Sequence, residues 1–237
     1  MKKSRLLILG LLAVIAFSGC VKDPEDPGYA RYMIVNAAPD IPNIDVFVDN
    51  EKQNIIPINF GSNTIYNGIT PGDRGITVTV GGTKNVFAEA RYMVANNASV
   101  TPTYTFLALH RQASAELLWI QDDLSLPAAG KAHLRIIHAS PDAPRVNAFV
   151  GTAATPIFTA ATGFGYKEVS SFVPIDATIL GVVYNIQIRN SITNAVVRTQ
   201  PMTAIAGKIY TIVVRGLVTP PANYTLNSLS STLVTNN

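Results

Sequence analysis

The chain has 237 residues, of which 48% are hydrophobic and 14% are charged, and its formal net charge is +3. Three of its 18 basic residues lie within the first five positions, so the chain without that segment has 15 basic residues against 15 acidic ones. This neutral balance excludes the basic footprint of a nucleic-acid-binding protein. With a single cysteine the chain forms no internal disulfide, so burial of apolar surface must stabilise it.

The N-terminus has the pattern of a bacterial lipoprotein signal peptide over residues 1–19. Met1–Arg5 is basic, and Leu6–Phe17 is apolar but too short to span a bilayer. Small residues follow, directly before Cys20, although Phe17 replaces the usual leucine. We expect cleavage before Cys20 and attachment of lipid, with palmitate among its acyl chains, to the Cys20 sulfur and amino group. Ordinary secretion with a free thiol is the alternative.

Residues 20–28 form the expected lipidated cysteine and its acidic linker, because the charges and prolines of Val21–Gly28 favour an extended, solvated chain. The acidic cluster resembles the export signals of Bacteroidetes lipoproteins, whereas the alternative is a polar spacer. We therefore expect a protein anchored by lipid to the outer membrane. Its exterior or periplasmic orientation stays open.

An internal repeat divides the rest of the chain. Ala30–Val48 aligns without a gap on Ala132–Val150, and eight of the nineteen positions are identical. Further matches pair Phe60-Gly61 with Phe164-Gly165 and Tyr104-Thr105 with Tyr210-Thr211. Because solenoid repeats are only ~20–50 residues long, a repeat of this length indicates tandem domains. We expect one domain over residues 29–124, a linker over 125–131 and a second domain over 132–237.

Both copies have the composition of β-strands separated by turns. Val, Ile, Thr, Tyr and Phe are enriched in short runs, and Gly, Pro, Asn and Asp lie between them. The predicted strands are Tyr32–Ala37, Ile44–Val48, Ile76–Val80, Tyr104–His110, Glu116–Gln121, Leu134–Ala139, Val146–Val150, Val182–Arg189 and Ile209–Arg215. This pattern predicts an all-β chain with two tandem antiparallel β-sandwiches, immunoglobulin-like or transthyretin-like. It does not predict the strand order.

The repeat carries a family resemblance. His138–Pro144 followed by Val146–Val150 resembles the opening of the bacterial family called domain of unknown function 4397, with its HASPDAP turn. Asn36–Pro42 keeps the turn in the first copy, with asparagine in place of histidine. The resemblance implies a secreted or anchored β-sandwich. It brings no catalytic residues to carry over.

The shared motif predicts a structural corner between two strands. Proline fixes φ and has no backbone donor, and aspartate accepts hydrogen bonds from backbone amides in turns. The residues concerned are Pro39, Asp40, Pro42, Pro141, Asp142 and Pro144. A calcium site is the alternative for the two aspartates, but such a cation needs about six oxygen ligands and no DxDxDG-like run supplies them. His138 shares a strand face with apolar residues, and we expect it to bond the Asp142 turn.

Catalytic and metal-binding patterns are absent from the sequence. His133 and His138 are five residues apart, so a strand points them to opposite faces, and His110 is remote in the sequence. There is no GxSxG elbow or Gly-rich phosphate loop. Asp122 and Asp123 diverge as neighbours in an extended segment, and we expect them to solvate the linker. The prediction is a protein without enzymatic activity, cofactor or bound metal.

Binding remains the function to test. Trp119 is a candidate platform for a sugar ring, although its apolar neighbours favour a core or interdomain position, and Tyr29, Tyr32, Tyr92 and Tyr166 are weaker candidates. The neutral composition suits uncharged partners such as glycans or cell-surface proteins. We predict a binding, adhesion or surface-assembly role. A glycan-capture module predicts a row of exposed aromatic rings, whereas a structural spacer predicts none and a long two-domain rod.

Overall fold

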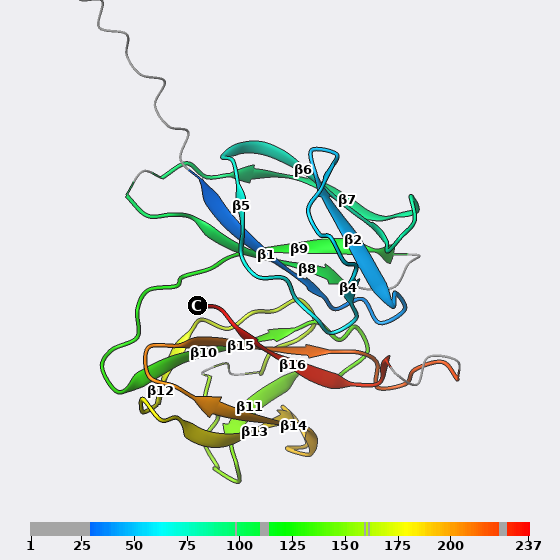
Figure 1. Cartoon of the computed structure of the whole chain (residues 1–237). Helices are drawn as coiled ribbons and strands as arrows, with labels where there is room; N and C mark the ends of the chain where they lie inside the picture. Colours follow the sequence, from blue (N-terminus) through cyan, green and yellow to red (C-terminus); the bar gives the residue numbers. More distant parts are fainter. Residues whose placement is uncertain (1–28, 98, 110–113, 159, 161, 223–226) are drawn as a thin grey trace, which may run out of the picture.

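The computed structural model describes residues 29–97, 99–109, 114–158, 160, 162–222 and 227–237. Cys20 with its leader and linker, and His110, lie outside these residues. Among them the chain forms β-strands and no α-helix, which confirms the predicted all-β class (Figure 1). The described residues accordingly offer no helix that could cross a membrane.

The two copies hold consecutive sets of strands. The strands of the first copy are β1 (Ala30–Asn36), β2 (Asn43–Val48), β3 (Glu51–Lys52), β4 (Ile58–Asn59), β5 (Asn67–Ile69), β6 (Gly72–Val80), β7 (Val86–Val94), β8 (Thr103–Leu109) and β9 (Glu116–Gln121). Those of the second copy are β10 (Lys131–His138), β11 (Val146–Val150), β12 (Val173–Asp176), β13 (Val182–Asn190), β14 (Val196–Ala204), β15 (Ile209–Arg215) and β16 (Ser230–Thr235). Each strand predicted from the sequence overlaps one of these, although the predicted ends at Ala37 and Ala139 lie one residue beyond β1 and β10.

Each copy is a sandwich of two sheets with equivalent strand orders, except that β3 and β4 of the first copy have no counterpart strand in the second. In the first copy the order β5-β1-β8-β9 faces the order β3-β2-β6-β7, and in the second copy β12-β10-β15-β16 faces β11-β13-β14. The pairs β1–β8 and β10–β15 are parallel, whereas the other paired strands are antiparallel. The predicted sandwiches are therefore confirmed, with one parallel pair in each.

The register of the strands matches between the copies. Tyr104 lies opposite Tyr32 in the first copy, and Tyr210 lies opposite Leu134 in the second. Equivalent residues of the two copies therefore differ by 102 in number on the first strand and by 106 on its parallel partner. In both copies the tyrosine hydroxyl accepts a hydrogen bond from a backbone amide, that of Ala95 at 3.1 Å and that of Ile205 at 3.2 Å. The two halves are therefore equivalent at the level of single hydrogen bonds.

One sequence match between the copies is wrong. Phe164 pairs with Val146 as Ile58 pairs with Ile44, so Phe164 is the structural equivalent of Ile58 and not of Phe60. Thr64 and Ser170, which also differ by 106 in number, are equivalent in the same way. The hydroxyl of Thr64 accepts a hydrogen bond from the amide of Ile34, and the hydroxyl of Ser170 accepts one from the amide of Ile136. A two-residue match around glycine was too short to fix the register.

Alternation along the strands places one core inside each sandwich. Tyr32 and Ile34 of β1 and Phe106 of β8 point into the first core, and Leu134 and Ile136 of β10 point into the second. Their neighbours in sequence are also buried, so β1, β8, β10 and β15 are covered on both faces. Such strands lose the apolar–polar alternation of a half-exposed sheet.

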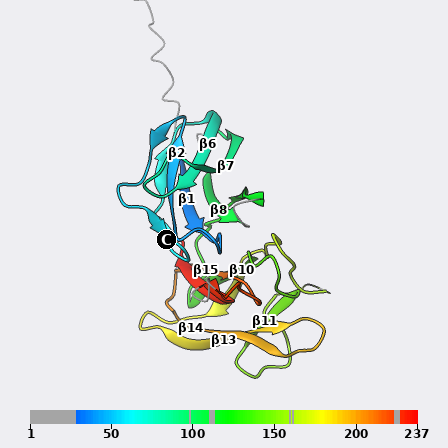
Figure 2. The ribbon, with the colours of Figure 1, turned by 90° about the vertical axis from the view of Figure 1, so that its right-hand side faces the viewer.

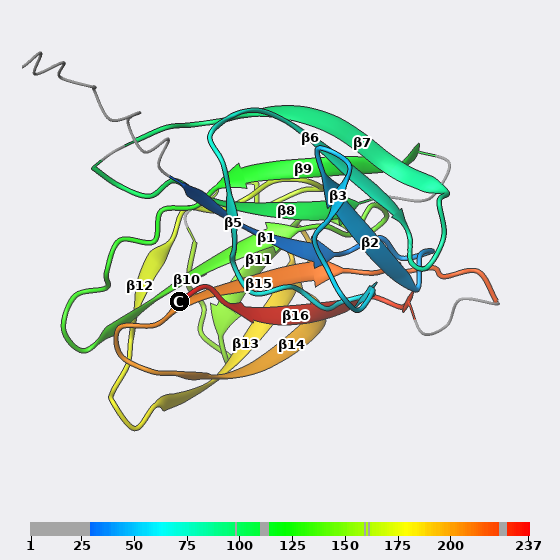
Figure 3. The ribbon, with the colours of Figure 1, turned by 45° about the horizontal axis from the view of Figure 1, so that its top comes forward.

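A third core fills the space between the sandwiches. It joins Met33, Val35, Ala37, Leu107 and Leu109 of the first copy to Ile137, Ala139, Val213 and Val234 of the second. The sheets that hold β1 and β10 face each other, and the four sheets lie in successive layers (Figures 1, 2 and 3). The two copies therefore form one packed body and not the extended rod that a spacer predicted. We call the junction between them the seam.

Candidate binding clefts along the seam

Trp119 lies in the aromatic stack of the first core. Its ring centroid is 4.7 Å from that of Tyr92, 4.2 Å from Tyr104 and 3.9 Å from Phe106. Tyr92 also donates its hydroxyl to the carbonyl of Leu117 on the same strand as Trp119. These contacts hold the half-buried indole between β7, β8 and β9, as its apolar sequence neighbours indicated. Tyr32 is buried, and Tyr29 is the only exposed aromatic residue in the described part of the chain.

The turn motif of the second copy ties two loops together. Asp142 accepts the amides of Val218 at 2.9 Å and Thr219 at 3.1 Å, so its carboxylate holds the segment that follows β15. Ser140 donates to the carbonyl of Gly216 at 2.7 Å. The aspartate thus binds backbone amides, as expected, but those of a distant loop instead of its own turn. Pro141 lies between these two anchors.

His138 is buried and bonds the same turn at another residue. Its Nε2 lies 3.0 Å from the carbonyl oxygen of Pro144, and because a carbonyl only accepts, Nε2 carries the proton. Burial lowers the pKa of His138, and the hydrogen bond to Pro144 opposes this effect. In the first copy Asn36 takes its place and donates to the carbonyls of Ile58 and Ile41. Pro39, Asp40 and Pro42 form the equivalent turn, where the carbonyl of Pro39 accepts a hydrogen bond from Asn227 of the other copy.

The described residues contain no group of three or more histidine, cysteine or acidic side chains that could hold a metal ion. His133 lies on β10 with its ring centroid 6.5 Å from that of Phe172. The two described histidines thus lie on opposite faces of β10, as their spacing predicted.

Asp122 is buried in the seam, so the expectation that it solvates a linker is wrong. Its Oδ1 lies 2.6 Å from a terminal nitrogen of Arg135, and the two side chains are 0% and 3% exposed. The Oδ2 atom accepts the hydroxyls of Thr105 at 2.7 Å and Tyr66 at 2.8 Å. Asp123, in contrast, is exposed and accepts the amide and hydroxyl of Ser125. The sequence did place the two carboxylates apart, but it did not show which one is buried.

The hydrogen-bond network around Asp122 continues across the seam. Arg135 donates Nε–H to the hydroxyl of Thr211 at 2.9 Å, and Thr211 donates to Oδ1 of Asn236 at 2.7 Å. Asn236 in turn donates to the hydroxyl of Tyr66 at 2.9 Å, which closes the network. Burial and the nearby Asp122 carboxylate raise the pKa of Tyr66, so the phenol stays protonated as a donor. Every member of this polar set is thereby satisfied inside an apolar seam.

A cleft of about 480 Å³ opens beside Tyr66 at the end of the seam where the C-terminus lies (Figure 1). We call it the Tyr66 cleft. Its walls come from the segment between β4 and β5 of the first copy and from the last residues of the second. The half-buried Tyr66 ring is covered on one side by the guanidinium of Arg31, 5.7 Å from the ring centroid. The remaining lining is mainly hydroxyl, amide and aliphatic, from Asn63, Thr64, Ile65, Leu124, Thr235 and Asn237.

A second cleft of about 370 Å³ occupies the equivalent place in the other copy, and we call it the His133 cleft. His133 stands where the first copy has Arg31, and Phe172 stands where it has Tyr66. Arg135, the equivalent of Met33, packs its guanidinium 4.5 Å from the centroid of the Phe172 ring. Gln121, Asp123 and Ser171 complete a more polar lining. Both clefts thus have an aromatic ring with a basic side chain beside it.

A third, smaller cleft of about 270 Å³ lies between these two, and we call it the middle cleft. It shares Arg31 and Leu124 with the Tyr66 cleft and Asp123 with the His133 cleft. The chain segment that leaves β9 runs along all three. Arg31 and Asp123 carry opposite charges, and Asp122 and Arg135 neutralise each other, so the arginine and aspartate charges of the clefts sum to zero.

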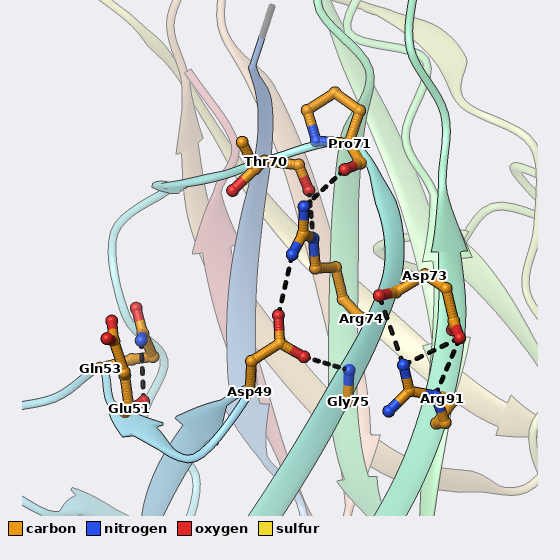
Figure 4. Close-up of polar contacts among 9 residues, drawn as sticks. All are labelled: Asp49, Glu51, Gln53, Thr70, Pro71, Asp73, Arg74, Gly75 and Arg91. Carbon is orange, nitrogen blue, oxygen red and sulfur yellow. Dashed lines mark hydrogen bonds and ion pairs between the residues drawn. The ribbon is translucent and has the colours of Figure 1, made fainter. Parts of the chain in front are cut away.

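A polar groove of about 350 Å³ lies away from the seam, at the edge of the first sandwich (Figure 4). Arg74 crosses it and donates to Asp49 at 3.0 Å and to the carbonyls of Thr70 and Pro71 at 2.8 and 2.7 Å. Asp49 has φ of 48° and Asn50 has φ of 70°, which gives the two-residue hairpin turn between β2 and β3. Arg74 and the amide of Gly75 lower the pKa of Asp49. Arg74 and Asp49, the charged residues at the centre of the groove, thus stabilise the hairpin turn after β2 and the turn at Thr70-Pro71.

Sequence reasoning missed Tyr66, Arg31 and Arg135 as cleft residues. Arg135 had a detectable signal, because a charged residue inside the apolar run Leu134–Ile137 must be paired if both faces of the strand are buried. Tyr66 and Arg31 had none, since both become cleft residues only through the contact between the copies.

Comparisons with known proteins place the chain in a family without adding a function. No curated protein matches it. Three solved structures resemble it distantly. A streptococcal virulence factor described as binding alpha-glucan has 10% identity and a TM-score of 0.25, with 80% of this chain and 92% of that one covered. A candidate adhesin from Bacteroides ovatus has 7% identity and a TM-score of 0.23, with coverage of 87% and 92%. A candidate cell adhesion protein from Bacteroides eggerthii has 10% identity and a TM-score of 0.21, with coverage of 89% and 96%.

TM-scores this low support no inference about the activity of this chain. The family comparison is decisive, because the family described as Domain of unknown function (DUF4397) matches residues 30–149 and again residues 132–235. The two matches begin where the two copies begin, and the first continues into β11 of the second copy. The chain therefore belongs to this family and holds two tandem copies of its domain.

Proposed function

We propose that the chain is a non-catalytic binding protein of the bacterial cell envelope that captures a neutral glycan in the Tyr66 cleft. The observation that supports this is the lining of the cleft, where an aromatic ring is surrounded by hydroxyl and amide groups and one guanidinium, without an aspartate or glutamate side chain. A sugar ring has apolar C–H faces and a rim of hydroxyls, so it suits an aromatic surface with donors and acceptors around it.

The lining is rigid, which favours binding. Thr64 accepts the amide of Ile34 at 3.0 Å, and Asn237 accepts the amide of Ile209 at 2.8 Å. Tyr66 is fixed by its hydrogen bonds to Asp122 and Asn236. Side chains that are already ordered lose little conformational entropy when a ligand binds. Arg31 makes no ion pair in the described part of the chain, so its guanidinium has donors for sugar hydroxyls.

An array of neutral polysaccharides probed with the purified full chain tests this proposal. We expect binding to at least one polysaccharide and a loss of about 10-fold in affinity for Arg31→Ala, since a hydrogen bond to a charged group contributes about 1.5–3 kcal/mol. Val86→Ala, an exposed substitution on β7, is the control and should bind like the unaltered chain. Silence across the array would overturn the proposal.

The seam itself favours a second candidate, a rigid assembly subunit of the envelope. The apolar core between the copies makes them one body. This suits a protein that holds its neighbours at fixed positions in an assembly, and not one whose domains close on a ligand. This candidate predicts no glycan binding and a protein partner instead. Crosslinking in intact cells distinguishes it, because a defined protein neighbour combined with a silent array would favour assembly over capture.

We further propose that lipid on Cys20 anchors the protein in the outer membrane. The support is the sequence pattern of residues 1–20, with the lone cysteine directly after an apolar leader. Mass spectrometry of the membrane-extracted protein should find residues 1–19 absent and acyl chains on Cys20. Cys20→Ser should release the protein from the membrane fraction, and an unmodified thiol in the native protein would overturn the anchor.

A further inference from the structure

The three seam clefts have common walls. Leu124 and Arg31 belong to both the Tyr66 cleft and the middle cleft, and Asp123 belongs to both the middle cleft and the His133 cleft. The clefts therefore adjoin one another along the segment 121–125. We call the three adjoining clefts together the seam groove. An aromatic ring lies towards each end of it, Tyr66 at one and Phe172 at the other.

We propose that the seam groove binds a single extended strand of a neutral polysaccharide, with the Tyr66 cleft and the His133 cleft as separate subsites of one site. This inference rests on the proposed function, because it takes the Tyr66 cleft as a glycan site. It adds a second subsite, a direction along the seam and a minimum length of ligand. A short oligosaccharide fills one cleft, whereas a longer one crosses the middle cleft and reaches Phe172.

The equivalence of the two copies supports two subsites for one type of ligand. Each end has a ring on the segment that precedes the short edge strand, Tyr66 before β5 and Phe172 before β12. Each ring lies near a basic side chain from the first strand of its copy. The guanidinium carbon of Arg31 is 5.7 Å from the centroid of the Tyr66 ring, and the ring centroids of His133 and Phe172 are 6.5 Å apart. A polymer presents the same chemical unit repeatedly, so repeated subsites suit it better than a single small molecule.

The charge of the groove favours a neutral polymer over a nucleic acid or an acidic polysaccharide. Asp122 and Arg135 pair with each other at 2.6 Å, and Arg31 faces the same middle cleft as Asp123. An anionic polymer needs an excess of basic groups along its path. The groove has none, since each of its arginines is matched by one of its aspartates.

The backbone of the groove favours a polysaccharide over an added peptide strand. A peptide that extends a sheet needs free backbone donors and acceptors along an edge. The amide of Thr64 is bonded to Ile34, that of Ser170 to Ile136 and that of Asp122 to Thr103. On the C-terminal wall, Asn236 donates its amide to Ile209. These four amides are therefore not available to an added strand, whereas the side chains around them offer hydroxyl and amide groups that suit sugar hydroxyls.

Calorimetric titration of the full chain with oligosaccharides of increasing length tests the inference. The probes are malto-, cello- and xylo-oligosaccharides of two to ten sugar units. For a series that binds, we expect affinity to rise at least 10-fold from the shortest binder to the longest, with one long oligosaccharide bound per chain. His133→Ala should weaken the long oligosaccharides at least 5-fold and leave the short ones unchanged, whereas Arg31→Ala should weaken both.

The controls separate this inference from the proposed function. Gln121→Ala, an exposed change in the same cleft, replaces His133→Ala if that variant unfolds at a lower temperature than the unaltered chain. Three results would overturn the extended site while the Tyr66 cleft stands: affinity that is independent of length, two long oligosaccharides per chain, or full affinity for the long oligosaccharides in the variant of the His133 cleft. No binding of any probe at any length would overturn both.

Discussion

The ion pair between Asp122 and Arg135 gives the most demanding test of the seam. The copies are equivalent, so each partner has a counterpart at the other end: Asn236 corresponds to Asp122, and Met33 corresponds to Arg135. The protein thus already contains an uncharged version of the same position. Replacing both charged residues with their counterparts, as Asp122→Asn with Arg135→Met, should leave the fold intact.

The single changes should be far more harmful than the double change. Asp122→Asn leaves the Arg135 guanidinium, which is 3% exposed, with uncharged acceptors only, and Arg135→Met leaves a carboxylate that is 0% exposed with two hydroxyl donors. Removing one partner of a buried ion pair costs about 3–5 kcal/mol, whereas replacing both with well-packed residues is often neutral. We expect each single variant to lose about 3 kcal/mol or more of unfolding free energy, and the double variant less than about 1 kcal/mol.

Urea denaturation of the four proteins measures the coupling between the two positions. Two single losses of about 3 kcal/mol against a joint loss below about 1 kcal/mol make the expected coupling energy about 5 kcal/mol, larger than the coupling of about 0.5–3 kcal/mol found for most residues in contact. The pair Lys131 and Asp176, which is exposed at the surface, is the control and should give a coupling below about 1 kcal/mol. Single variants that lose less than about 1 kcal/mol, or losses that simply add, would refute the buried pair as a structural link between the copies.

Three further predictions concern the core, a buried histidine and a turn. Leu107→Ala removes a fully buried side chain from the core between the copies, so it should lower the unfolding free energy by about 2–5 kcal/mol. The two copies should still unfold in one calorimetric transition, at a lower temperature, and two separate transitions would contradict a common core. His138→Asn should flatten the pH dependence of the melting temperature. Burial depresses the folded-state pKa of His138 below its ordinary value of 6.5. The stability that the neutral ring contributes is therefore full above pH 6.5 and is lost as the pH falls through the folded-state pKa. An unchanged slope of melting temperature against pH, between pH 7 and pH 5, would refute this. Gly216→Ala should lower the melting temperature more than Gly82→Ala, since both have positive φ but only at Gly216 would a Cβ overlap the backbone of Ser228; equal melting temperatures would contradict the close approach.

The sequence predicted nine strands rich in β-branched and aromatic side chains, including the edge strands β9 and β11, but it missed β7, β12, β14, β16 and the short strands β3, β4 and β5. β7 and β14 were missed because their exposed faces carry polar residues and β14 contains Pro201. Proline is tolerated there since β14 lies at the edge of its sheet, where a missing backbone donor breaks no ladder beyond it. Composition therefore identifies the strands that are rich in β-branched and aromatic residues, whether one face or both are buried, and it misses strands that are short or carry many polar residues.

The seam had a signal in the sequence that only the structure explains. Runs such as Phe106–Leu109 and Ile212–Val214 are apolar at every position, whereas a half-exposed strand would alternate. On its own, such a run predicts a β-strand and does not show that both of its faces are buried. Their second face needs a covering layer, and a duplicated domain offers an identical apolar face as that layer. The candidate site was beyond prediction for the same reason, since Tyr66 and Asn236 meet only after the copies pack.

Duplication within one chain also explains how the seam can be asymmetric. In a symmetric dimer of a single copy, both subunits would carry the same residue at each equivalent position, so a buried arginine would have to be satisfied twice. The tandem chain has Met33 at one position and Arg135 at the other, and it pairs the arginine with Asp122 while Asn236 serves the opposite end. One end can therefore become apolar and aromatic and the other polar, while the strand register that builds both stays the same. On this reasoning, the residues that differ between the copies along the seam are the ones that set what each cleft binds.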